Sequence, residues 1–268
     1  MARLTLDGLT MRFRTRRGET ITALEGISFE VQDREFAVLV GTSGCGKSTI
    51  LRLVAGLIPP TGGQALVDGR PVSGPGAERG MVFQTYTLFP WLTIQQNVEF
   101  GPRLRGAPAA ERTELARRYL ARVGLRGFEK VYPKELSGGM MQRVAIARAL
   151  ANDPAVLLMD EPFGALDAKT RALMGEMLVR LWEGAAKTVL FVTHDIEEAL
   201  FLGDRVFVMT ARPGRIREEI RVPLPRPRTV DMLTSDTFVA LKRRVMDLIR
   251  EEALRTIERE PGFVEEPA

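Results

Sequence analysis

The chain has 268 residues, of which 45% are hydrophobic and 27% charged, and it carries a net charge of +4 and a single cysteine. This balance is typical of a globular α/β protein, and it excludes an internal disulfide bond and, since no apolar run approaches about 20 residues, a membrane-spanning helix. The charge excess is too modest to favour nucleic acid as a partner, and the first residues lack the apolar stretch of a signal peptide.

The N-terminal segments "LTLDGLTMRF" (4–13) and "ISFEV" (27–31) alternate apolar and polar residues. Alternation of this kind predicts strands of an antiparallel sheet with one buried face. Later runs are apolar almost throughout, which predicts fully buried strands of a parallel sheet; they cover residues 36–40, 155–159, 188–193 and 205–209. Each lies near a helix-like segment, so we expect a doubly wound α/β core with a smaller antiparallel sheet beside it.

A glycine-rich segment, "GTSGCGKST" (41–49), follows the run 36–40 directly and precedes a helix-like stretch. Between a strand and a helix this pattern predicts a phosphate-binding loop, because glycines let backbone N–H groups approach phosphate oxygens and the helix N-terminus adds positive charge. Lys47 would reach the β- and γ-phosphates of ATP, and the Ser48 hydroxyl would bind Mg²⁺. The predicted nucleotide contacts are Gly41, Thr42, Ser43, Gly44, Cys45, Gly46, Lys47, Ser48 and Thr49. We also expect thiol reagents to reach Cys45 and ATP to protect it.

The stretch from Gln84 to Asn152 has apolar residues at helical spacing and is interpreted as a helical subdomain of about residues 85–152 inserted into the core. Its beginning, Leu88–Ile94, gathers apolar and aromatic side chains around Pro90. They either belong to the core of the subdomain or form an exposed patch for a partner helix, and we favour the second interpretation. Further on, "LSGGM" (136–140) places two glycines before a helix, which is a second anion-binding pattern.

Two later strands end in polar side chains. The run "VLLMDEP" (156–162) ends in Asp160, which suits Mg²⁺, and in Glu161, which suits a water molecule that attacks the γ-phosphate. His194, the only histidine, follows the run 188–193. A lone histidine is more often structural, but this one ends a strand at the edge where ligands bind in open α/β sheets, which favours a γ-phosphate contact.

The C-terminal part begins with "RVPLPRPRT" (221–229), whose three prolines exclude a helix. A last helix follows, with an apolar stripe at Phe238, Leu241, Val245, Leu248 and Ile249. We expect this stripe to pack on the core of the chain rather than on a partner, and residues 259–268 to be frayed. The chain is therefore divided into an ATPase domain, residues 1–228, and a C-terminal helical extension and tail, residues 229–268.

Taken in order, the phosphate loop, "MVFQ" ending at Gln84, "LSGGM", "VLLMDE", "GALD" (164–167) and His194 resemble the ATP-binding subunit of an ABC transporter. The resemblance covers nearly the whole chain. It implies a P-loop NTPase core with an N-terminal antiparallel β-subdomain, an inserted helical subdomain and a C-terminal helix, with ATP and Mg²⁺ as ligands. It also implies that Gln84 binds Mg²⁺ and senses the γ-phosphate, and that Phe13 stacks on adenine.

The resemblance further implies a head-to-tail dimer. In it the signature loop of one subunit, "LSGGM" (136–140), completes the nucleotide site of the other. Ser137, Gly138 and Gly139 would contact the partner's nucleotide, and Asp167 would lie near the interface. A homodimer is expected, although a pair of related ATPases stays open. Two residues differ from the commonest family pattern, since Met140 replaces Gln and Gly164 replaces Ser, but neither change removes a phosphate ligand.

Residues 88–98 and 211–228 resemble the nitrate, sulfonate, taurine and bicarbonate group of ABC importers. This implies a peripheral ATPase on the cytoplasmic face of the bacterial inner membrane, with permease subunits docked near Leu88–Ile94 and a periplasmic solute-binding protein as an indirect partner. Importers of thiamine precursors or riboflavin are an alternative. A soluble ABC protein acting on DNA, ribosomes or iron–sulfur assembly is disfavoured, because the chain shows neither paired cassettes nor long inserts nor charged arms.

Overall fold

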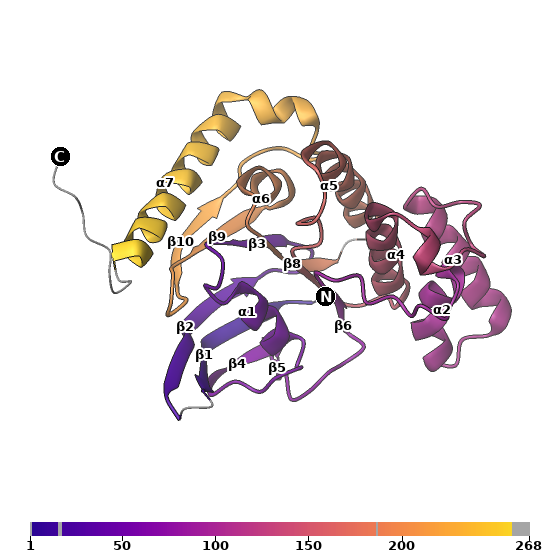
Figure 1. Cartoon of the computed structure of the whole chain (residues 1–268), viewed down its shortest axis with the longest axis horizontal. Helices are drawn as coiled ribbons and strands as arrows, with labels where there is room; N and C mark the ends of the chain where they lie inside the picture. Colours follow the sequence, from indigo (N-terminus) through magenta and orange to yellow (C-terminus); the bar gives the residue numbers. More distant parts are fainter. Residues whose placement is uncertain (1, 16–17, 186, 259–268) are drawn as a thin grey trace.

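The computed structural model describes residues 2–15, 18–185 and 187–258, which form two sheets surrounded by helices (Figure 1). The smaller sheet is antiparallel, with the strand order β2-β1-β4-β5. Its strands are β1 (Leu4–Arg14), β2 (Thr20–Val31), β4 (Gly62–Val67) and β5 (Arg70–Pro71). Leu4 and Leu6 are buried on one face while Asp7 is exposed. This confirms the half-buried antiparallel sheet that the alternation of apolar and polar residues predicted.

The larger sheet has six strands in the order β10-β9-β3-β8-β7-β6, and only β10 runs antiparallel to its neighbour. Its strands are β3 (Phe36–Val40), β6 (Arg79–Val82), β7 (Val156–Asp160), β8 (Thr188–Thr193), β9 (Arg205–Met209) and β10 (Ile216–Arg221). The four expected apolar strands are present, and the predicted fold class is confirmed. The edge strand β6 was not predicted, since four residues that include Arg79 and Gly80 carry too little apolar pattern.

Seven helices and two short 3₁₀ turns surround the sheets in the described part of the chain. They are α1 (Lys47–Val54), α2 (Ile94–Leu104), α3 (Ala109–Arg122), η1 (Pro133–Glu135), α4 (Gly138–Ala151), α5 (Ala168–Glu183), α6 (Ile196–Leu202), η2 (Val230–Thr234) and α7 (Asp236–Glu258). Several helices begin after a residue whose side chain caps the N-terminus, as Asp167 does for α5 and Asp195 does for α6. Helices α2, α3 and α4 lie together beyond the β6 edge of the larger sheet (Figure 1).

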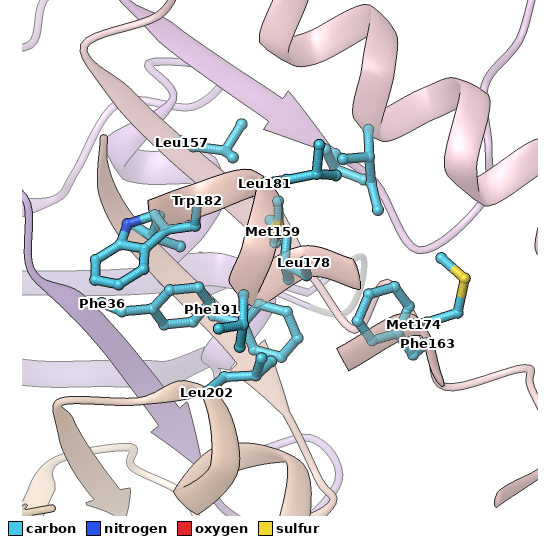
Figure 2. Packing of buried hydrophobic residues seen from close by; sticks show 14 of the residues in the cluster. Phe36, Leu157, Met159, Phe163, Met174, Leu178, Leu181, Trp182, Phe191 and Leu202 are labelled. Carbon is cyan, nitrogen blue, oxygen red and sulfur yellow. The ribbon is translucent and has the colours of Figure 1, made fainter. Parts of the chain in front are cut away.

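The core occupies both faces of the larger sheet. Along β3, Phe36, Val38 and Val40 belong to one buried cluster and Ala37 and Leu39 to the other, because successive side chains point to opposite faces. Figure 2 shows the first cluster, in which Trp182 of α5 lies edge-on to Phe36 with ring centroids 5.6 Å apart. This packing fixes β3 in the centre of the sheet, and β3 leads directly into the phosphate loop.

The C-terminal helix α7 lies against the rest of the chain (Figure 1). Phe238 and Val245 are buried, and Leu241, Leu248 and Ile249 pack partly buried against the same core, which confirms the expected stripe. The tail expected to be frayed, 259–268, lies outside the described residues. No helix in the described ranges is both long and apolar enough to cross a membrane. The division at residue 228 and the limits of the helical subdomain stay predictions.

Candidate nucleotide site

The phosphate loop joins the end of β3 to the start of α1. Gly46 precedes the first helical residue with φ of 103°, a conformation that side chains disfavour. A Cβ on Gly46 would also lie 2.5 Å from the Leu24 Cδ2 atom of β2. Only glycine fits this turn, and the turn aims the unpaired N–H groups of the first turn of α1 into the loop.

Lys47 is buried at the start of α1, with a side chain that turns back into the loop. Its Nζ donates hydrogen bonds to the carbonyl oxygens of Gly41 at 2.8 Å and Thr42 at 3.0 Å. The Glu161 Oε1 atom lies 3.9 Å from the same ammonium group. Since an ammonium ion prefers charged oxygens to neutral carbonyls, the loop holds a positive charge that phosphate oxygens would contact more strongly.

Ser48 and Asp160 meet behind the loop. The Ser48 hydroxyl donates to Asp160 Oδ1 at 2.7 Å, which brings α1 and the end of β7 together. Burial raises the pKa of Asp160 above its ordinary value, while the hydrogen bond from Ser48 acts in the opposite direction. The two oxygens are hard donors of the kind that Mg²⁺ prefers, and a cation beside them would offset the cost of burying the carboxylate.

Glu161 follows β7 with φ of 42°, a left-handed conformation that is uncommon outside glycine and costs energy. Its backbone N–H donates to Val192 O of β8 at 2.9 Å, which holds the strained residue in place. The side chain lies against His194, whose Nδ1 is 2.9 Å from Glu161 Oε2. The two residues therefore meet at one edge of the sheet, as their positions at the ends of neighbouring strands predicted.

Lys47, Ser48 and Glu161 line one cleft of about 440 Å³. Asp160 and His194 are not among the lining residues, but they contact Ser48 and Glu161, which are. The residues that line the cleft and were expected at the site are Phe13, Ser43, Gly44, Gly46, Lys47, Ser48, Thr49, Gln84 and Glu161. Phe13 is 42% exposed, so it is open to a ligand instead of packed in the core. Ile21 and Ala23 of β2 and Arg212 also line the cleft. The sequence did not predict a role at this site for Arg212, which lies in the loop after β9.

The signature segment forms a different cleft of about 570 Å³, whose described lining includes Ser137, Gly139 and Asp167. These residues are not among those that line the first cleft. Ser137 is exposed and caps α4, with its Oγ accepting from Met140 N at 3.3 Å. The structure thus brings the expected signature residues together, but α4 and α1 lie in different parts of the molecule (Figure 1).

The burial of Cys45 contradicts the expectation that thiol reagents reach it. Its side chain is only 1% exposed and lies beneath the loop instead of facing the cleft. Burial raises the pKa of the thiol, although the nearby Lys47 ammonium acts in the opposite direction. The thiol is therefore both covered and poorly ionised, so the expectation of a reagent-accessible cysteine is wrong. The sequence placed Cys45 in the loop correctly but could not show on which side its Sγ lies.

The segment Leu88–Ile94 is held firmly while part of it faces solvent. Asn97 of α2 is buried, donates to the carbonyls of Phe89 and Leu92 at 3.2 and 3.1 Å, and accepts from Phe89 N at 2.8 Å. Trp91 is 70% exposed, with its ring 5.7 Å from that of Phe89. The segment is neither wholly core nor loose, because Ile94 is buried and Trp91 is open.

These features define a P-loop ATPase, and comparisons with known proteins give the family. Residues 24–164 match the family model for "ABC transporter". The chain is 49% identical over 253 residues to the nitrate import ATP-binding protein NrtD of Synechocystis sp., covering 92% of this chain and 95% of that protein. It is 47% identical over 223 residues to the taurine import ATP-binding protein TauB of Roseobacter denitrificans, with 83% of each chain covered.

A solved structure is similar throughout its length. It is a dimeric ATP-binding cassette in a post-hydrolysis state with bound ADP and Pi, 35% identical to this chain, with a TM-score of 0.74 over 83% of this chain and 100% of that one. The chain therefore belongs to the ABC transporter family. It is an ATP-binding subunit of that family and an ATPase.

Proposed function

We propose that this chain is the ATP-hydrolysing subunit of an ABC importer that drives uptake of a small anion such as nitrate, a sulfonate, taurine or bicarbonate. Relatives named for nitrate and taurine import, both at nearly half identity, support this substrate class. They give no support to thiamine precursors or riboflavin. The observation that carries the proposal is that Lys47, Ser48 and Glu161 line one cleft, with Asp160 bonded to Ser48 and His194 in contact with Glu161.

Binding of ATP is assigned to the loop Gly41–Thr49, with Lys47 on the β- and γ-phosphates and Phe13 stacked on adenine. Ser48, Gln84 and Asp160 would hold Mg²⁺, which would neutralise charge on the phosphates. The Ser48–Asp160 hydrogen bond of 2.7 Å and the presence of Gln84 in the cleft lining support this ligand set. A γ-phosphate bound near the Lys47 ammonium would also lie near Glu161, since Lys47 Nζ is 3.9 Å from Glu161 Oε1.

Hydrolysis is assigned to Glu161 and His194. Glu161 would accept a proton from the water whose oxygen attacks the γ-phosphorus, while the bond from that phosphorus to the bridging oxygen breaks and ADP leaves. The contact of His194 Nδ1 with Glu161 Oε2 at 2.9 Å holds the carboxylate in one orientation. The opposite ring nitrogen would then be free to contact the γ-phosphate.

Two copies of the chain would form the working unit. At the start of α4, exposed Ser137 and half-buried Gly138 and Gly139 form a helix N-terminus that suits an anion but does not line the chain's own nucleotide cleft. In the proposed dimer Ser137, Gly138 and Gly139 of each copy contact the nucleotide of the other, with Asp167 near the interface. The dimeric state of the similar cassette with ADP and Pi supports this arrangement.

The membrane partner would dock on Leu88–Ile94, where Trp91 is exposed on a segment fixed by Asn97. The subunit would then lie peripherally on the cytoplasmic face of the inner membrane, with a periplasmic solute-binding protein acting through the permease. Trp91→Ala should leave basal ATPase activity unchanged and lower coupled uptake. Leu104→Ala, at the end of α2, is the control because that side chain is 72% exposed outside the segment. Equal loss of both activities in the Trp91 variant would contradict docking here.

The proposed function is tested by co-expression with the permease subunits of a nitrate or taurine importer, followed by reconstitution in vesicles. Uptake of nitrate, taurine or bicarbonate that requires ATP, and that Lys47→Ala abolishes, is the expected result. A chain that stays away from the permease and binds DNA with a steep dependence on salt would instead support a soluble ABC protein.

A further inference from the structure

The loop 210–214, which joins β9 to β10, is packed against the phosphate loop. Gly214 N donates to Ala23 O at 2.9 Å, and Glu25 N donates to Gly214 O at 3.0 Å, so β2 holds this loop from one side. A Cβ on Gly214 would lie 2.1 Å from Cys45 O, which shows how closely the two loops approach. The position of the loop 210–214 is thus fixed relative to the nucleotide cleft.

Arg212 extends from this loop onto the phosphate loop. Its Nε donates to the Gly44 carbonyl at 3.1 Å, and its guanidinium lines the same cleft as Lys47. A guanidinium has five N–H groups, so four stay available for other acceptors. No carboxylate pairs with Arg212 among the described residues, in contrast to Arg215, which pairs with Glu25. Lys47 and Arg212 are the two cationic residues of the described cleft lining.

The C-terminal helix holds the loop from the other side. Glu252 of α7 is 3% exposed, and its Oε2 accepts from Ala211 N, the residue before Arg212, at 3.1 Å. Its Oε1 is 2.9 Å from both Arg217 Nη1 of β10 and Arg255 Nη1 of α7. A buried carboxylate with two arginine partners keeps a fixed position, so it fixes the backbone beside Arg212.

We propose that Arg212 is a phosphate ligand of the bound nucleotide, and that Glu252 of α7 is a positioning residue for it. The ligand is a nucleoside di- or triphosphate, bound by the free N–H groups of the guanidinium while Nε stays on Gly44. A planar fork of donors matches the oxygens of a phosphate chain. The C-terminal helix thereby sets the affinity for nucleotide. This inference rests on the proposed function, because it needs the first cleft to bind ATP.

The first test is equilibrium binding of ATP, ADP and GTP to the purified full chain, measured by calorimetry. Arg212→Ala should weaken binding of each nucleotide by about tenfold, the loss expected for a hydrogen bond to a charged group. Arg212→Lys should keep part of the affinity, since it retains the charge without the fork. Arg215→Ala is the matched control, because it removes an exposed arginine of the same hairpin that does not line the cleft.

The outcomes separate this inference from the proposed function. If Lys47→Ala binds ATP as well as the unchanged chain does, the first cleft is not the nucleotide site and the proposed function fails. If Lys47→Ala loses binding while Arg212→Ala matches Arg215→Ala, only the role of Arg212 is overturned. A changed preference between ATP and GTP in Arg212→Ala would also overturn it, because it would show a contact with the base.

The role of Glu252 is tested by a double-mutant cycle. Glu252→Ala should weaken ATP binding about threefold in the unchanged chain and have no effect in the Arg212→Ala background, because positioning acts only through Arg212. Equal losses in both backgrounds would overturn the positioning role. Circular dichroism checks that each variant is folded, and if Glu252→Ala does not fold, Glu252→Leu, which removes the acceptor for Ala211 N but keeps a side chain of similar size, takes its place in the cycle with the same expected outcome.

Discussion

The phosphate loop and the signature loop share a local sequence pattern, a glycine-rich segment before a helix, but their side chains differ in burial and in hydrogen-bond partners. At the start of α1, Lys47 is buried and bonded to Gly41 and Thr42, and Ser48 is bonded to Asp160. At the start of α4, Ser137 is exposed. Its Oγ caps its own helix through Met140 N. The phosphate loop is therefore bonded to a strand distant in the sequence, whereas the bond of the signature serine stays within its own helix.

This difference indicates that the two loops have different roles in binding and hydrolysing the nucleotide. Glu161, which is suited to the chemistry, lines the first cleft together with Lys47, and it contacts His194. The second cleft offers a helix N-terminus, a hydroxyl and Asp167 without a lysine of a phosphate loop. A region with binding groups and no chemistry of its own is what a second subunit would contribute.

The largest effect is expected for Glu161→Gln. Removing the carboxylate that accepts the proton should lower the rate of phosphate release by about 100- to 1000-fold while ATP still binds. Glu197→Gln is the control, since Glu197 is an exposed carboxylate of α6 that pairs with Lys242. A Glu161 variant that hydrolyses ATP at the rate of this control would show that the chemistry does not lie at the first cleft.

Ser137→Ala should act on the other region. We expect hydrolysis to fall about tenfold, because a hydrogen bond to a charged group is lost, while ATP binding to the dilute monomer stays unchanged. The change also removes a helix cap, which costs about 1 kcal/mol of stability. Ser235→Ala is matched for that cost, since Ser235 accepts from Phe238 N near the start of α7. Equal activity in the two serine variants would contradict a role for Ser137 at the nucleotide.

Cysteine alkylation compares the two loops directly. Cys45 should react with iodoacetamide at least about tenfold more slowly than a cysteine at the signature position, tested as Ser137→Cys with Cys45→Ala. Because burial raises the pKa of the Cys45 thiol, less thiolate is present near neutral pH, and its rate should continue to rise at a pH where a free cysteine has levelled off. Similar rates at both positions would show that the phosphate loop opens readily.

The smallest effect concerns the stability of the fold around α6, where Glu198 is buried. Burial raises the pKa of Glu198 from 4.5 to about 7. The folded protein therefore binds more protons than the unfolded chain between these values, so Glu198 lowers stability as pH rises through that window. Glu198→Gln should raise Tm by about 3 °C at pH 8 and by less at pH 5. Parallel curves of Tm against pH for the unchanged chain and Glu198→Gln would contradict the raised pKa of Glu198.

The sequence predicted those elements that are determined by a pattern of neighbouring residues. Four strands of the larger sheet were found because each is an apolar run bounded by turn signals, and the phosphate loop because its residues are contiguous. The sequence did not indicate β6, whose place depends on pairing with β7. It also gave no indication of Arg212, which reaches Gly44 across 168 residues, or of the burial of Cys45. Such features arise from tertiary contacts and leave no periodic signal.

The central claim is that two copies of the chain enclose ATP between the phosphate loop of one and the signature loop of the other. The most direct measurement is the molar mass of Glu161→Gln by light scattering, with and without Mg²⁺ and ATP, at micromolar concentration. The account predicts twice the monomer mass with ATP, the monomer mass without it, and a monomer again when Ser137→Tyr is added to fill the signature loop. A monomer at saturating ATP, or a dimer that the added tyrosine leaves intact, would contradict it.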